Sequence, residues 1–113
     1  MSIFLRTGDP QALAARFNGL IAAREISAWT VDRFGNYFHD VPHWHYAAFF
    51  NPVMLGDGLR LNLHFIDKGC DRRFCFAELH GAMMQALLQH CGDRFHDAHL
   101  SRGPDYGDEP FDA

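Results

Sequence analysis

Histidines form the densest cluster of reactive side chains in this chain of 113 residues. His39, His43 and His45 lie close together, and His64 falls in a later run with strand character. Neutral imidazole nitrogens bind transition metals, and side chains two apart in a strand point to the same face of a sheet. The spacing therefore makes His43, His45 and His64 a candidate site for zinc or another transition metal, with His39 or Asp40 as a further ligand. The alternative is a set of solvated histidines on a strand, because no Glu accompanies them at a catalytic spacing.

His80 is the second candidate, because it lies in the apolar stripe of an expected helix, one turn from Phe76 and from Met84. Burial would lower its pKa, and a nearby carboxylate would raise it. One interpretation makes His80 the polar group of a ligand pocket between the sheet and this helix. The other is a core histidine whose ring bonds a backbone carbonyl, and the sequence favours this role over that of a catalytic base.

Motifs for covalent catalysis or cofactor binding are absent from the sequence. It contains no Gly-x-Ser-x-Gly, no phosphate-binding glycine loop and no His-Glu-x-x-His. Cys70, Cys75 and Cys91 lack the spacing of a zinc finger, so we expect reduced structural thiols and a cytoplasmic location. The sequence thus favours a protein that is not an enzyme and has no cofactor, apart from the transition metal considered above.

The charge balance argues against nucleic-acid and membrane partners. Ten basic and fourteen acidic side chains give a net charge of −4, and the basic ones are scattered apart from Arg72-Arg73. No positive stripe is present to follow a phosphate backbone. No run approaches the ~18 apolar residues that cross a bilayer, and the N-terminus has no signal-peptide pattern. Length and composition fit one folded domain over residues 1–100, followed by an acidic tail with Gly and Pro at 101–113.

Two amphipathic helices are predicted. Asp9-Pro10 is a helix-start signal, since Asp can accept the free N–H groups of the first turn and Pro is tolerated there. Apolar residues then recur on one face, which predicts a helix over residues 10–25. A second, longer apolar stripe predicts a helix over residues 73–91 that Gly92 ends. A strand through residues 74–76 ahead of this second helix is the alternative.

A first hairpin is predicted between the two helices, where the apolar period changes to two. Gly35-Asn36 can supply the positive-φ residues of a two-residue turn. This turn would join residues 28–34 to residues 37–41 and place Asp32 opposite His39.

A second hairpin follows along the chain. Asp57-Gly58 is a strong turn signal, and it would join residues 43–50 to residues 59–67. A short last strand within residues 94–100 is the one addition to the sheet that the sequence indicates.

The second hairpin divides its side chains between two faces. Alternation places one set in the core: Trp44, Tyr46, Ala48, Phe50, Leu59, Leu61, Leu63 and Phe65. The opposite face carries a mixed polar and apolar set, here called the candidate interaction face: His43, His45, Phe49, Arg60, Asn62, His64 and Ile66. This face must be solvated or covered by a partner.

These elements predict a two-layer α+β fold, in which an N-terminal and a C-terminal helix pack on one face of an antiparallel sheet of four to five strands, built from two consecutive hairpins. Bacterial toxin-neutralising proteins and small accessory subunits share this size and sign of charge. We therefore expect a protein-interaction module that binds a protein partner, or forms a homodimer, through the candidate interaction face. A small metal-binding protein or metal-dependent enzyme that uses the strand histidines is the alternative.

Overall fold

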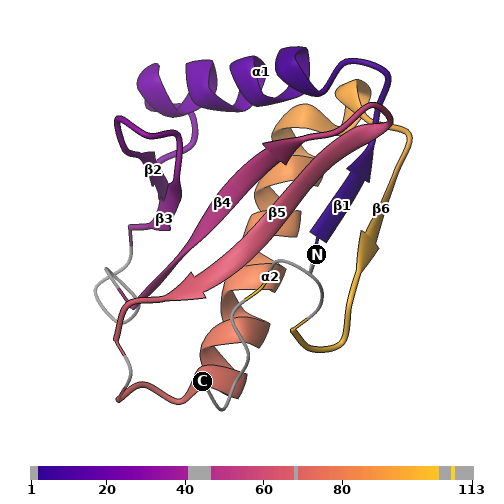
Figure 1. Ribbon diagram of the computed structural model, residues 1–113. Helices are drawn as coiled ribbons and strands as arrows, with labels where there is room; N and C mark the ends of the chain where they lie inside the picture. Colours follow the sequence, from indigo (N-terminus) through magenta and orange to yellow (C-terminus); the bar gives the residue numbers. More distant parts are fainter. Residues whose placement is uncertain (1–2, 41–46, 68, 105–107, 109–113) are drawn as a thin grey trace.

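Six strands pair into one antiparallel sheet, and two helices complete an α+β fold (Figure 1). The computed structural model describes residues 3–40, 47–67, 69–104 and 108. The elements follow the chain in this order: β1 (Ile3–Arg6), α1 (Pro10–Ala22), β2 (Trp29–Val31), β3 (Tyr37–His39), β4 (Ala48–Met54), β5 (Gly58–Phe65), α2 (Arg72–Cys91), the 3-10 turn η1 (Gly92–Arg94) and β6 (Asp97–Leu100).

The order of strands across the sheet is β2-β3-β4-β5-β1-β6. The prediction of four to five strands was too low, and neither helix is terminal, because β1 precedes α1 and β6 follows α2. β1 was missed because its short apolar run shows no alternation that would identify a strand. It pairs with β5 on one side and with β6 on the other, so the N-terminal strand joins the last strand to the rest of the sheet.

Both helices begin at an aspartate that caps the first turn. The Asp9 carboxylate accepts the N–H of Ala12 over 3.1 Å, and Pro10 follows directly, as predicted. The Asp71 carboxylate accepts the N–H of Phe74 over 3.2 Å. Because α2 already begins at Arg72, residues 74–76 are helical, and the alternative strand there was wrong.

The first hairpin has a longer turn than predicted. Trp29 lies opposite His39, so the expected pairing of Asp32 with His39 was wrong. Asp32 belongs to the turn, where its carboxylate accepts the N–H groups of Phe34 and Asn36, each over 2.9 Å. An Asp side chain that bonds the backbone in this way stabilises a turn of its own, which outweighed the two-residue turn signal.

The second hairpin confirms the predicted division of its side chains for the residues that the structure describes. Phe50 lies opposite Leu63, and Phe49 lies opposite His64. The inward residues are buried: Ala48, Phe50, Leu59, Leu61, Leu63 and Phe65. Trp44 and Tyr46 were expected among them but lie outside the described residues.

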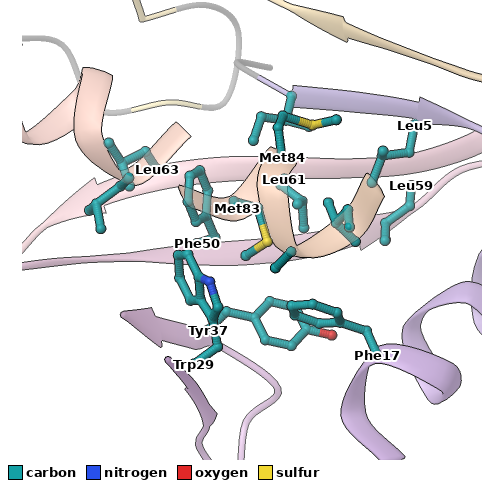
Figure 2. Close-up of a cluster of buried hydrophobic side chains, with 14 of the residues drawn as sticks. Leu5, Phe17, Trp29, Tyr37, Phe50, Leu59, Leu61, Leu63, Met83 and Met84 are labelled. Carbon is teal, nitrogen blue, oxygen red and sulfur yellow. The ribbon is translucent and has the colours of Figure 1, made fainter. Parts of the chain in front are cut away.

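The helices and the inward face of the sheet share one core (Figure 2). Phe17 of α1 meets Tyr37 of β3 edge to face, with ring centroids 5.1 Å apart. The Tyr37 hydroxyl donates to Oδ1 of Asn18 over 2.6 Å, so the polar end of this buried ring has a partner. Phe50 of β4 and Met83 of α2 are fully buried in the same cluster. Removing such apolar area from water is the main force that holds α2 along the sheet.

Neither described helix has the length and apolar character needed to cross a membrane.

Candidate functional site

Three flat side chains form a row across neighbouring strands on the side of the sheet that faces away from the core, here called the outer face. Phe38 of β3 stacks on Phe49 of β4 at 5.3 Å between centroids, with ring planes 30° apart. Phe49 stacks in turn on His64 of β5 at 5.4 Å, with ring planes 24° apart. All three are only partly buried. The row is therefore an aromatic surface, held in place by strand alternation.

The candidate interaction face is largely described by the structure. Arg60 and Asn62 lie on the same side of β5 as His64. Asn62 is only 4% exposed, and its side-chain oxygen is buried without a hydrogen-bond partner in the described ranges of the chain. Ile66 lies just beyond the end of β5 and is 48% exposed. The remaining two members, His43 and His45, lie outside the described residues.

The candidate metal site depends on that same segment. Of its three predicted ligands the structure describes only His64, whose ring takes part in the row of stacked side chains. His39 lies on the inner side of the sheet against Trp29, because it alternates with Phe38 of the outer face. His39 and His64 therefore point to opposite faces of the sheet. Within the described ranges, no three His, Cys, Asp or Glu side chains gather closely enough to hold a metal.

His80 has the geometry of a core histidine. It is 4% exposed, and its Nδ1 lies 2.7 Å from the carbonyl oxygen of Phe76, one helical turn earlier. Its ring stacks on that of Phe76 at 3.8 Å and meets the edge of Phe50 at 5.0 Å. Burial lowers the pKa of His80 to about 4, against opposing effects of the Phe76 carbonyl and of Asp108. The ring is thus neutral at pH 7, and Nδ1 carries the proton that it donates to the carbonyl.

The second nitrogen of His80 is buried as well. Among the residues that the structure describes, none forms a hydrogen bond with this Nε2. With the proton on Nδ1, Nε2 is an acceptor left without a donor, which costs folding free energy. His80 is not among the residues that line the hollow beside α2. Its role as the polar group of a ligand pocket stays a prediction.

A hollow of about 320 Å³ lies between α2, β3 and the segment that leads into β2. His39 and Trp29 are among its lining residues, and their ring centroids lie 4.7 Å apart. Burial lowers the pKa of His39, while the charges of Glu78 and Asp40 act in the opposite direction. Gln85 and Gln89 line the hollow from α2. The sequence places His39 near other histidines and contains no local signal that connects it with these glutamines, since their proximity arises only when α2 docks on the sheet.

The cysteines are poor nucleophiles. Cys75 and Cys91 are buried, and Cys70 is partly buried. Burial raises the pKa of Cys75 to about 12, and it also raises the pKa values of Cys70 and Cys91. All three side chains are free thiols, and raised pKa values keep them in the less reactive protonated form.

No protein-family model, no curated protein and no solved structure matches the chain. Its own surfaces and hollows are therefore the evidence for its function.

Proposed function

We propose that the protein is a protein-interaction module that assembles with a second copy of itself through the outer edge of β6. The observation that carries this proposal is the state of that strand. Within the described ranges β6 ends the sheet, and no strand pairs with its outer side (Figure 1). An edge strand presents unpaired N–H and C=O groups, which form a template for a further strand.

β6 has few of the features that protect edge strands from pairing. Its sequence, Asp97-Ala98-His99-Leu100, contains neither Lys nor Pro. The one charged residue is already neutralised, since Arg6 donates to the Asp97 carboxylate over 2.9 Å and 2.6 Å. Leu100 is 44% exposed at the end of the strand. An apolar residue and a compensated charge at an unpaired edge strand favour pairing with a strand of another chain.

Strand alternation restricts how two copies of β6 can pair. Asp97 and His99 lie opposite Arg6 and Phe4, on the outer face, whereas Ala98 and Leu100 alternate with them on the inner side. Two copies related by a two-fold axis perpendicular to the sheet must place like-facing residues opposite each other. Within β6, two positions of the axis pair the most residues. The axis passes through the pair formed by Ala98 with its copy, or through the pair formed by His99 with its copy.

Hydrogen bonding selects between these two registers. An axis at Ala98 places each Asp97 carboxylate opposite His99 of the second copy, where the carboxylate can accept the N–H of the imidazole, and it does so twice. An axis at His99 places the two imidazoles opposite each other instead. Hydrogen-bonded cross-strand pairs contribute roughly 0.2–1 kcal/mol each, and like charges in the same positions destabilise. The register centred on Ala98 is therefore the one that we propose.

Joining the sheets in this register turns both outer faces to the same side. The two aromatic rows, each formed by Phe38, Phe49 and His64, then belong to one continuous surface. Such a surface extends the candidate interaction face over two chains, and it is where a different protein partner would bind.

Sedimentation velocity over a range of protein concentrations, from about 10 μM to about 1 mM, tests the proposal. We expect a monomer–dimer equilibrium for the wild type. His99→Asp places a carboxylate opposite Asp97 of the second copy, and it should weaken dimerisation about tenfold. Gln11→Glu adds the same charge on exposed α1 and should leave dimerisation unchanged. A wild type that stays monomeric throughout would overturn the proposal.

A charge exchange separates the two registers. The double variant Asp97→His with His99→Asp restores unlike pairs when the axis passes through Ala98, so dimerisation should recover. It leaves two carboxylates face to face when the axis passes through His99, and dimerisation should then stay weak. Loss of the exposed Arg6–Asp97 pair has little effect on stability, because exposed pairs contribute little.

A further inference from the structure

Two of the three free thiols lie together at the start of α2. Cys70 is partly exposed in the connection between β5 and α2, whereas Cys75 is fully buried near the beginning of the helix. The Cys75 thiol donates a hydrogen bond to Sγ of Cys70. Cys91, at the other end of the same helix, is buried as well. An accessible thiol therefore touches a buried one.

The cap of α2 explains why these two side chains meet. Asp71 is the N-cap residue, and its carboxylate accepts the N–H of Phe74. Cys70 directly precedes the cap, and Cys75 lies four positions after it. In capped helices the side chains at these two positions often pack against each other, in a contact usually made by apolar residues. Here both are cysteines, so the ordinary geometry of a helix start holds two thiols face to face.

Backbone hydrogen bonds fix the position of each cysteine. The Asp67 carboxylate accepts the N–H of Gly69 over 2.9 Å, and the Asp67 carbonyl accepts the N–H of Cys70 over 3.4 Å. The N–H of Cys75 bonds the carbonyl of Asp71 over 2.9 Å. The turn before α2 and the first turn of the helix thus keep the two sulfur atoms as neighbours.

We propose that Cys70 and Cys75 are a site of reversible oxidation, at which a hydroperoxide converts the two thiols to a disulfide. Cys70 reacts first, because it is the accessible thiol. With hydrogen peroxide, its sulfur attacks one oxygen, the O–O bond breaks, and a sulfenic acid and water form. The Cys75 sulfur then attacks the sulfenic sulfur, and a second water leaves as the S–S bond forms. The two thiol protons leave in these waters, and two electrons pass from the sulfur atoms to the peroxide.

The groups around the pair set the speed of this reaction. Burial and the charge of Asp67 raise the pKa of Cys70, and the hydrogen bond from Cys75 and the charge of Arg72 offset this only in part. Burial, followed by the neighbouring Cys70, Asp67 and Asp71, raises the pKa of Cys75 to about 12. Because the thiolate is the nucleophile, oxidation should be slow at pH 7 and about tenfold faster at pH 8. The pair therefore responds to lasting exposure to an oxidant.

A disulfide would make the packing contact at the helix start covalent. The folded chain already places the two sulfur atoms together, so we expect the bond to form with little distortion. It restricts the unfolded chain over residues 70–75, and the melting temperature should rise by about 5 °C. Reduction with dithiothreitol should restore the lower melting temperature. An oxidised protein that melts at or below the temperature of the reduced one would contradict the assignment.

A count of free thiols tests the proposal directly. The folded wild type is treated with hydrogen peroxide, denatured, alkylated with iodoacetamide and weighed by mass spectrometry. We expect one alkylated cysteine after oxidation, and three when dithiothreitol precedes alkylation. Counting thiols keeps oxidation of the exposed Met54 out of the result. Trypsin cleaves after Arg72 and Arg73, so the disulfide should join two separate peptides, one of which carries Cys70.

Single variants locate the bond. Cys70→Ser changes a partly exposed residue and should keep both remaining thiols under peroxide, whereas Cys91→Ala should form the disulfide as the wild type does. Three free thiols in the treated wild type would overturn the proposal. So would an equal loss of thiols in Cys70→Ser, or a covalent dimer of the wild type on a non-reducing gel.

This site is separate from the proposed dimer, since it lies at the start of α2 and contains no residue of β6. The His99→Asp variant should therefore form the disulfide as the wild type does. Failure of the proposed dimer and failure of the thiol pair would thus appear in separate measurements.

Discussion

Trp29 and His39 lie directly opposite each other in the β2–β3 hairpin, with ring centroids 4.7 Å apart and ring planes tilted by 32°. This pairing turns the imidazole of His39 towards the inner side of the sheet, away from His64. It also leaves Nδ1 buried, with no hydrogen-bond partner in the part of the chain that the structure describes. The position of His39 thus places its ring on the opposite face of the sheet from His64 of the candidate metal site.

The unpaired nitrogen of His39 predicts a gain in stability when it is removed. His39→Phe keeps a flat ring against Trp29 and removes the buried polar atom, so the free energy of unfolding should rise by about 1 kcal/mol. Urea denaturation measures the effect. His64→Phe makes the same substitution on the outer face and serves as the control. A destabilised His39→Phe would contradict the prediction.

His80 predicts a loss of stability in mild acid. Its pKa in the folded protein is about 4, below the ordinary value of 6.5, so the unfolded chain binds more protons between these two pH values. The stability contributed by the neutral ring is complete above about pH 6.5 and decreases as the pH falls towards 4, by roughly 3 kcal/mol in total. Burial of His39 adds to the same trend, since its pKa is also lowered.

Removal of the imidazole tests the origin of this trend. His80→Leu keeps an apolar side chain of similar size in the core, and it should flatten the dependence of unfolding free energy on pH between 7 and 4.5. Urea denaturation at several pH values measures it. His96→Gln, at an exposed position, should leave the dependence as it is in the wild type. Equal acid sensitivity of His80→Leu and the wild type would show that His80 is not the cause.

Gly58 tests the close contact between β1 and β5. A Cβ atom at this position would meet the backbone oxygen of Leu5, and it would lie 2.6 Å from Cζ of Phe4. Gly58→Ala should therefore destabilise the protein by about 2 kcal/mol, because the Leu5 carbonyl cannot move without disturbing the pairing of these strands. Gly56→Ala, in the adjoining turn, meets nothing within 4 Å and should change stability by less than about 0.5 kcal/mol. Equal effects in thermal denaturation would contradict this packing.

Patterns that are local in the sequence predicted the structure well. Asp9-Pro10 predicted the start of α1, since the cap bond joins residues only three positions apart. Alternation along β5 identified the buried side chains from Leu59 to Phe65, because parity does not depend on the length of the turn. These features involve interactions between residues close in the chain.

Interactions between distant residues could not be predicted in the same way. β1 becomes a strand because it pairs with residues 58–61 and 97–100, which lie far away in the sequence. The hollow at His39 depends on the docking of α2 against β3, and the sequence contains no local signal for the approach of Gln85. The predicted pairing of His39 with Asp32 was wrong for a related reason. The sequence indicates a two-residue turn at Gly35-Asn36, whereas the turn has five residues.

A cysteine at the proposed two-fold axis tests dimerisation through β6 most directly. Ala98 should face its own copy, at a separation that a disulfide can span between opposite residues of paired strands. Under mild oxidation, Ala98→Cys should give a covalent dimer by mass spectrometry, in higher yield than His99→Cys, with the wild type as the control for Cys70, Cys75 and Cys91. A monomeric Ala98→Cys, or preferential cross-linking of His99→Cys, would contradict the proposed assembly.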